Sequence, residues 1–222
     1  MREDGRMKDE IRPLTLEKDY TRYAEGSVMA QAGQTRVLCT AMVQDGAPLH
    51  CRQQGIGWVT AEYAMLPSSN PDRKSLHRHP NGRTREIQRL IGRSLRMAVD
   101  LSQIGSRTIW IDCDVIQADG GTRTLSITGG FVALIDALWD LREKEKIETM
   151  PIKDGLSAVS VGILDGMPML DLCSSEDKSA AVDMNVVMTH SGEFVELQGT
   201  AEAAPFGDQA LDGMLDLAKQ GN

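Results

Sequence analysis

The segment from Asp119 to Arg123, Asp-Gly-Gly-Thr-Arg, has the residue types of an anion-binding site. It lies between an alternating segment at 108–117 and a segment with apolar residues at helical spacing at 124–142, so it predicts a strand-to-helix turn. Paired glycines permit unusual backbone angles, while the threonine hydroxyl and the guanidinium supply donors at the positive end of the helix. A tight turn without a ligand explains the glycines equally well, and both interpretations stay open here.

Two aspartates, Asp177 and Asp183, form a second candidate site. They flank a short polar connection that follows one predicted hairpin and enters the next, so both carboxylates could meet at one strand end. Mg²⁺ binds through one or two carboxylates and keeps several waters, so the pair has the composition of a magnesium site. Acids in loops more often stabilise turns, and the spacing alone favours that interpretation.

Basic residues are concentrated between positions 72 and 96, although the whole chain has a net charge of −8. The window holds eight Lys or Arg residues and two acids. A basic run is usually a solvated face, but this concentration in an acidic protein favours a surface that faces phosphate groups. No aromatic residue lies between Ala64 and Ile109, so base stacking is not expected there. The candidate nucleic-acid-binding residues are Arg73, Arg78, Arg89 and Arg93.

Several other kinds of site are disfavoured. The four cysteines are widely separated without a CxxC pair, which favours reduced thiols in a cytosol-like compartment over zinc or disulfides. The four histidines have no metal-ligand spacing, and the sequence lacks GxSxG, a P-loop glycine-lysine and GxGxxG. No apolar run is long enough for a membrane span, so we expect a soluble, cytoplasmic protein that does not bind membranes.

The elements that must position these residues alternate between β and α patterns. Strands are predicted at residues 27–32, 35–43, 55–64, 108–117, 158–164, 169–172, 182–189 and 193–199. Helices are predicted after Gly82, at 124–142 and at 207–220, with a basic loop at 66–82 and a polar loop at 174–181. This order predicts a single α+β domain over residues 1–222, with a mixed sheet and helices on one side.

Two of the predicted helices have features that bear on packing. The helix after Gly82 is amphipathic, and its basic residues follow a stripe separate from the apolar one: Arg85, Arg89, Arg93 and Arg96. The helix at 124–142 contains Gly129 and Gly130, each of which costs about 1 kcal/mol relative to alanine. Close approach of this helix to a neighbouring element is the expected compensation.

Longer motifs give the chain a resemblance to a known family. In order they are REDGR (2–6), EGS (25–27), GWVTAEYAMLP (57–67), GRTREIQRLIGRSLR (82–96), IDCDVIQADGGTRT (111–124), EDKSAAVDMNVV (176–187) and VELQGTAE (195–202). With these motifs the sequence resembles the bacterial ribonucleases PH, tRNA nucleotidyltransferases that trim RNA 3′ ends with inorganic phosphate. The resemblance covers nearly the whole chain.

The resemblance implies a fold, an assembly and a site. The fold is the α+β ribonuclease PH fold, akin to the second domain of ribosomal protein S5, assembled as a homohexameric ring of three dimers. The attacking phosphate is implied to bind at Arg83, Gly121, Thr122 and Arg123. Asp177 and Asp183 are implied to hold Mg²⁺ and to act in catalysis with Arg83 and Arg123.

Some positions depart from the family pattern. Ser68 and Ser69 follow MLP where arginines are usual, and the loop before Gly82 is about three residues shorter. Ser174 replaces a tyrosine and Lys178 replaces a serine around the ED motif, and the chain ends at Asn222, before the full length of the usual C-terminal helix.

Three functions follow from these observations. The first is a phosphate-dependent 3′-to-5′ exoribonuclease that trims tRNA precursors and other RNA and releases nucleoside diphosphates. The second is a ring subunit of exosome type that binds RNA without cutting it or with weak activity. The third is an unrelated small-molecule phosphotransferase, which the lack of a glycine-rich nucleotide loop disfavours.

Overall fold

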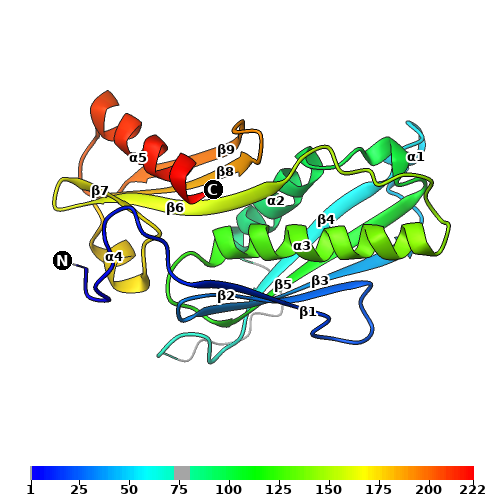
Figure 1. Cartoon of the computed structure of the whole chain (residues 1–222), viewed down its shortest axis with the longest axis horizontal. Coiled ribbons are helices and arrows are strands. Elements are labelled where there is room, and N and C mark those ends of the chain that lie inside the picture. The colour runs from blue at the N-terminus through cyan, green and yellow to red at the C-terminus, as the bar shows by residue number, and fades with distance from the viewer. Residues whose placement is uncertain (1, 73–80) are drawn as a thin grey trace.

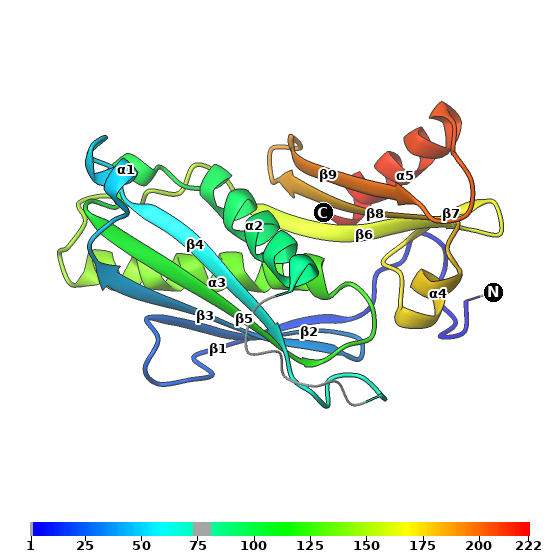
Figure 2. The same cartoon turned by 180° about the vertical axis from the view of Figure 1, so that it is seen from behind.

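The computed structural model describes residues 2–72 and 81–222, seen from two sides in Figures 1 and 2. The elements of the first part are β1 (Leu14–Lys18), β2 (Gly26–Ala32), β3 (Thr35–Asp45), α1 (Leu49–Arg52), β4 (Trp58–Met65), α2 (Gly82–Met97), a 3-10 turn (Leu101–Gln103), β5 (Arg107–Gln117) and α3 (Thr122–Glu143). Those of the second part are β6 (Leu156–Leu164), β7 (Met167–Leu170), α4 (Ser174–Ser179), β8 (Val182–Thr189), β9 (Phe194–Ala201) and α5 (Asp208–Gly221).

The first sheet is mixed, with five strands in the order β1-β2-β3-β5-β4. Its neighbours are antiparallel except for β4 and β5, which run parallel. Strand β5 alternates as predicted, since Ile109, Ile111 and Val115 are buried whereas Asp112 and Asp114 on the other face are partly exposed. Helix α3 packs on β2 and β3, and α2 packs on β4, so the core of this sheet lies beneath the two helices.

The second sheet has four antiparallel strands in the order β7-β6-β8-β9, and α5 packs across β6, β7 and β8. The α+β class with a mixed sheet and packed helices is confirmed, but the expectation that all strands share one sheet is wrong. Hydrophobic periodicity identifies a strand without identifying its neighbour, so the division into two sheets was not visible in the sequence. The prediction of a single domain stays a prediction.

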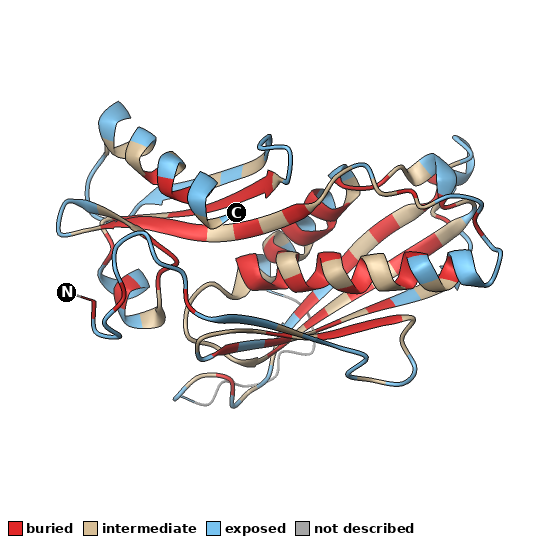
Figure 3. Cartoon of the chain, in the orientation of Figure 1, coloured by how far each residue is buried: buried red, intermediate tan, exposed pale blue. Residues whose placement is uncertain are grey.

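Helix α3 is the element that both sheets share. One side packs on β2 and β3 and another on β6, and Figure 3 shows buried residues along most of its length. A helix that is apolar on most sides is suited to this position. By length and composition α3 could cross a membrane, but 67% of its most apolar window is buried within the protein, as is typical of a core helix.

Gly129 and Gly130 confirm the predicted close packing of this helix. A Cβ atom at Gly129 would lie 2.8 Å from the Cβ of Ala30 and 2.8 Å from the Sγ of Cys39. At Gly130 a Cβ would lie 3.1 Å from a methyl carbon of Ile111. The glycines therefore let α3 lie against the sheet at a distance that larger residues would prevent.

The segment predicted as a polar loop at 174–181 is instead partly helical. Helix α4 begins after Cys173, whose backbone N–H donates to the Glu176 carboxylate at 2.9 Å in a capping box. Glu176 is buried and also accepts two hydrogen bonds from Arg2. This cap and the distant partner stabilise a turn of helix whose polar composition alone suggested a loop.

Candidate active site

The turn predicted at Asp119 to Arg123 joins β5 to α3. Gly120 and Gly121 have φ angles of 76° and 65°, in the left-handed region that glycine adopts without strain. Gly121 is the N-cap of α3, and no side chain caps this end of the helix. The first N–H groups of a helix have no intrahelical partner, so Thr122 and Arg123 begin the helix with backbone donors available to an anion.

A cavity of about 120 Å³ brings together the residues singled out in the sequence. Arg83 from α2 and Gly121, Thr122 and Arg123 at the start of α3 form one side, here called the phosphate rim. Asp177 from α4 and Asp183 from β8 form the other side, here called the acid rim. The lining is completed by Met65, Asn70, Ala118, Gly120, Ser160, Leu172, Ser174 and Asn185.

Arg123 is held at the cavity by contacts from two other elements. Its Nη2 donates to Glu86 of α2 at 3.0 Å, and the other oxygen of Glu86 accepts from the Nε2 of Gln198 on β9 at 2.6 Å. The Nε of Arg123 is buried and has no hydrogen-bond partner among the described residues. A buried donor without an acceptor is unfavourable, so an anion in the cavity would satisfy this group.

The two acids differ in their surroundings. Asp177 lies exposed in α4, whereas Asp183 is half-buried near the start of β8. Burial, followed by the negative charge of Asp177, raises the pKa of Asp183 to about 6, although Arg123 and Arg83 oppose the shift. Both acids lie in regular elements rather than in a loop, so the interpretation that they are loop acids that stabilise turns is wrong.

The composition of the acid rim fits a magnesium ion. Two carboxylates on one cavity are a sufficient protein contribution for Mg²⁺, and a cation would offset the repulsion between them. Within residues 2–72 and 81–222 there is no group of three or more His, Cys, Asp or Glu side chains placed to hold a metal. The rim therefore fits an ion that keeps much of its water shell, and a fully protein-enclosed site is not found there.

Comparison with known protein families assigns the chain to one of them. Residues 10–139 match domain 1 of the 3′ exoribonuclease family RNase PH, and residues 156–221 match its domain 2. The chain belongs to this family. The two matched segments correspond closely to the parts of the chain that form the first and second sheets.

Solved structures share the fold of this RNase PH family member. An Archaeoglobus fulgidus exosome with RNA bound to the active site matches with a TM-score of 0.84 and 21% identity, covering 99% of this chain and 89% of the other. An archaeal exosome core matches at 0.78 and 21% identity, covering 98% and 86%. Rice (Oryza sativa) Rrp46 matches at 0.79 and 17% identity, covering 97% and 92%. The predicted RNase PH fold is thereby confirmed.

The basic residues of the family member are divided among different surroundings. Arg83 lies exposed in the first turn of α2, with Asn81 as the N-cap. Arg89 is exposed, and Arg93 forms an ion pair with Glu196 of β9 at 2.6 Å. Arg73 and Arg78 lie outside the described residues, so RNA binding by these four arginines stays a prediction.

Arg96 departs from the predicted arginine stripe of α2. Its guanidinium lies 4.2 Å from the ring centroid of Trp58, and it donates to the carbonyl of Val59 at 2.9 Å. Arg96 therefore packs against the end strand β4 and is not part of a free basic surface.

Tyr63 is a cavity-supporting residue that our sequence analysis did not single out. Its hydroxyl lies 3.0 Å from that of Thr122, and burial raises its pKa, although the Thr122 hydrogen bond opposes the shift. Tyr63 lies within the GWVTAEYAMLP motif and alternates with exposed residues on β4, so the sequence pattern could have identified it as a buried residue. The pattern does not indicate that its partner is Thr122. Asn70, Ser160 and Asn185 also line the cavity and were not singled out.

Proposed function

We propose that the protein is a phosphate-dependent 3′-to-5′ exoribonuclease that removes terminal nucleotides from tRNA precursors and other RNA and releases nucleoside diphosphates. Membership of a 3′ exoribonuclease family supports the general activity. The observation that carries the proposal is that the phosphate rim and the acid rim line one cavity. In phosphorolysis, inorganic phosphate attacks the phosphorus of a phosphodiester. The enzyme therefore needs hydrogen-bond donors for the attacking phosphate and charge-neutralising groups for the scissile phosphate, close enough together for the two phosphates to react.

In the proposed reaction the phosphate rim binds and orients inorganic phosphate. Arg83, the backbone amides at the start of α3 and the Thr122 hydroxyl would surround it, while Glu86 keeps Arg123 facing the cavity. An oxygen of this phosphate attacks the phosphorus of the last 3′ linkage in line, and the bond to the 3′ oxygen of the preceding nucleotide breaks. The attacking hydrogen phosphate loses its proton as the new bond forms, and the leaving oxygen takes one up through water, so the products are a nucleoside diphosphate and an RNA shorter by one nucleotide.

The acid rim has a supporting role in this reaction. Asp177 and Asp183 would hold Mg²⁺, which when bound supplies positive charge next to the scissile phosphate. The exposed arginines of α2, together with Arg73 and Arg78, would bind the RNA backbone, with little sequence readout. The proposed assembly is a cytoplasmic homohexameric ring made of three dimers, as in the resembling bacterial enzymes.

A second candidate function is an RNA-binding ring subunit with weak or no activity. The observation that favours it is that two of the matched solved structures are exosome structures, with TM-scores of 0.84 and 0.78. Lys178 beside Asp177 adds a positive charge next to the acid rim, and this charge would compete with a cation there. In this case the chain would bind RNA while turnover depended on another subunit.

One assay separates the two functions. The purified protein is incubated with a tRNA extended at its 3′ end, and with an unrelated RNA, in Mg²⁺ with and without phosphate. The exonuclease predicts nucleoside diphosphates only when phosphate is present. RNA binding without any mononucleotide product supports the ring subunit, whereas nucleoside monophosphates released without phosphate contradict phosphorolysis. Size-exclusion chromatography with light scattering tests the hexamer.

A further inference from the structure

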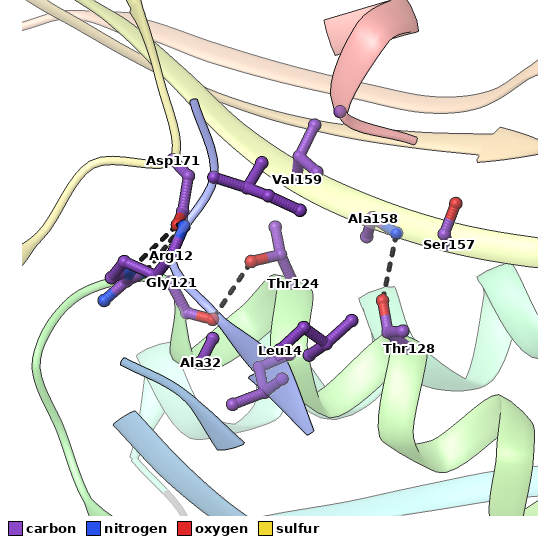
Figure 4. A pocket seen from close by; sticks show the side chains of 13 residues that line it. Arg12, Leu14, Ala32, Gly121, Thr124, Thr128, Ser157, Ala158, Val159 and Asp171 are labelled. Atoms are coloured by element: carbon purple, nitrogen blue, oxygen red, sulfur yellow. Dashed lines mark hydrogen bonds and ion pairs between the residues drawn. The ribbon is translucent and has the colours of Figure 1, made fainter. Parts of the chain in front are cut away.

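The N-terminal segment places a cluster of buried charges beside the active-site cavity. Arg2, Arg6 and Arg12 have exposed fractions of 8%, 9% and 5%, and they surround the acids Asp171 and Glu176, which are equally buried. Figure 4 shows Arg12 and Asp171 next to Gly121, around a second, smaller cavity that shares this glycine with the active site. None of these charged residues lines the active-site cavity itself.

Arg12 connects Asp171 to the turn of the phosphate rim. Its Nε and Nη2 donate to the two oxygens of Asp171 at 2.8 and 2.6 Å, and its Nη1 donates to the backbone carbonyl of Asp119. Burial by itself would raise the pKa of Asp171, but the hydrogen bonds and charge of Arg12 hold it below its ordinary value. The same turn is held by Thr35, whose hydroxyl donates to the carbonyl of Gly120 at 2.7 Å.

Arg2 makes a corresponding connection to the acid rim. It donates to both oxygens of Glu176, each at 2.7 Å, and to the carbonyls of Leu170 and Asp171, each at 2.8 Å. Glu176 caps helix α4 through the N–H of Cys173 and directly precedes Asp177. Arg2 therefore fixes the short helix on which the exposed acid lies.

Stability alone does not explain the cluster. Buried ion pairs often add little net stability, because the desolvation of the charges offsets their attraction. Asp171 also has a φ angle of 52°, a left-handed conformation that is strained for a residue with a side chain. Strain and buried charge both occur where the chain passes from β7 toward α4, next to the turn of the phosphate rim.

We propose that Arg12 and Arg2 are positioning residues, Arg12 for the phosphate rim and Arg2 for Asp177, so that the N-terminal segment sets the relative placement of the two rims. This inference rests on the proposed phosphorolytic function. It assigns different kinetic effects to two arginines of one cluster. Loss of Arg12 loosens phosphate binding, whereas loss of Arg2 displaces Asp177, one of the two acids proposed to hold the cation.

The test compares Arg12→Lys and Arg2→Lys by phosphate KM, kcat and melting temperature. Lysine keeps the charge but cannot make the paired contacts of a guanidinium. Arg12→Lys is expected to raise the phosphate KM about tenfold with kcat nearly unchanged, and Arg2→Lys to lower kcat about tenfold with KM unchanged. The matched control is Arg107→Lys, a partly buried arginine at the far end of β5 that donates to the carbonyl of Ile104, and it should alter neither.

Equal changes in KM and kcat for both variants, in proportion to the fall in melting temperature, would overturn the proposal. If Arg12→Lys does not fold, Thr35→Val removes the neighbouring hydrogen bond to the turn and should also raise KM; an unchanged KM overturns the role of the turn support. If Arg2→Lys does not fold, Glu176→Gln weakens the same contact and should lower kcat.

The failure of the proposed function can be recognised separately. If the wild-type protein releases no nucleoside diphosphate, phosphorolysis is excluded. Backbone amide hydrogen exchange of the same variants then tests, without a need for activity, whether the two arginines hold the two rims in place. Arg12→Lys should speed exchange in residues 118–124, and Arg2→Lys in residues 173–180. Exchange that is unchanged in these segments, or raised equally in both by either variant, contradicts the proposal.

Discussion

The phosphate rim and the acid rim face the same cavity but are supported in different ways. Three residues of the phosphate rim cap or begin α3, a helix of 22 residues that is buried between the two sheets. Asp177 of the acid rim lies on α4, a helix of 6 residues whose cap depends on Arg2, 174 positions earlier in the chain. Both rims therefore receive a long-range contact from the N-terminal segment, but the phosphate rim also lies at the end of a large buried helix, whereas Asp177 lies on a short one.

This difference suggests a division of roles. Phosphate is a small, symmetrical ion that needs a stable set of donors, and the end of a core helix provides one. In the proposed reaction the acid rim acts on an RNA end that enters and leaves, and the short surface helix α4 is held by polar contacts to Glu176 more than by apolar packing. Substitutions in the acid rim should thus affect turnover, and those in the phosphate rim should affect phosphate affinity.

The largest effect is expected from Asp177→Asn. Loss of the charge removes one of the two carboxylates proposed to hold the cation, and we expect kcat to fall by roughly a thousandfold, within the range for loss of one electrostatic group. RNA affinity should change little. Release of nucleoside diphosphates and filter binding of RNA measure the two quantities.

The matched control for Asp177→Asn is Asp212→Asn, an exposed aspartate on α5 away from the cavity. It should leave kcat unchanged. A fully active Asp177→Asn protein would contradict the role of the acid rim, and a variant that loses RNA binding in parallel would mean that Asp177 positions RNA instead.

The next largest effect concerns stability, and it compares the buried ion pair of Arg12 and Asp171 with an ion pair at the surface. Asp171→Asn leaves Arg12 buried without its charged partner, which should lower the free energy of unfolding by about 3 to 5 kcal/mol. Asp140→Asn removes an ion pair with the exposed Lys144 and should lower the free energy of unfolding far less, because solvent screens that pair. Urea unfolding at neutral pH measures both, and equal effects would mean that burial of the cluster is energetically unimportant.

The same variant has a predicted dependence on pH. Because Arg12 holds the pKa of Asp171 below its ordinary value, near 4 for an aspartate, the stabilisation is present above that pH and is lost as the pH falls further. The stability difference between wild type and Asp171→Asn should therefore be largest near neutral pH and narrow below about pH 4. A difference that stays constant to pH 3 would contradict the assignment.

The same contrast explains how much the sequence could reveal. The strand, the turn and the helix from 107 to 143 follow from alternation, two glycines and helical spacing, all of which are local, and the structure has them close to the predicted bounds. Asp177 and Asp183 could be nominated, but their meeting with Arg123 depends on how the second sheet packs across α3. No periodicity in the sequence records that packing.

Helix α4 and Tyr63 show the limit most clearly. The polar segment at 174–181 lacks an apolar stripe, and its helix depends on the capping box of Cys173 and Glu176 and on the buried contact between Arg2 and Glu176. Tyr63 was visible as a strand residue, but its hydrogen bond to Thr122 joins residues 59 positions apart. Contacts of this kind arise from tertiary packing, which local propensity does not encode.

Arg123→Ala should affect phosphate more than RNA. Removal of a charged donor to phosphate is expected to raise the phosphate KM by roughly 10- to 100-fold, with the RNA dissociation constant nearly unchanged. Arg142→Ala is the matched control, because Arg142 lies on the same helix at the opposite end and stacks on Trp139. An equal loss of phosphate and RNA affinity in Arg123→Ala would contradict a rim devoted to phosphate.

The smallest effect is expected from Glu86→Gln, which tests how the phosphate rim is oriented. Glu86 holds Arg123 at 3.0 Å and is itself held by Gln198, and its side chain is 39% exposed, so solvent weakens the ion pair. Loss of the charge should raise the phosphate KM about two- to fivefold, because the guanidinium is less well oriented while its own charge remains. Glu62→Gln is the control. Glu62 lies on β4 and accepts a hydrogen bond from Gln88 of α2, the helix that also carries Glu86, but Glu62 does not line the cavity. A fall in the phosphate KM would show instead that Glu86 competes with phosphate for Arg123, and the phosphate rim would then be partly closed in the absence of its ligand.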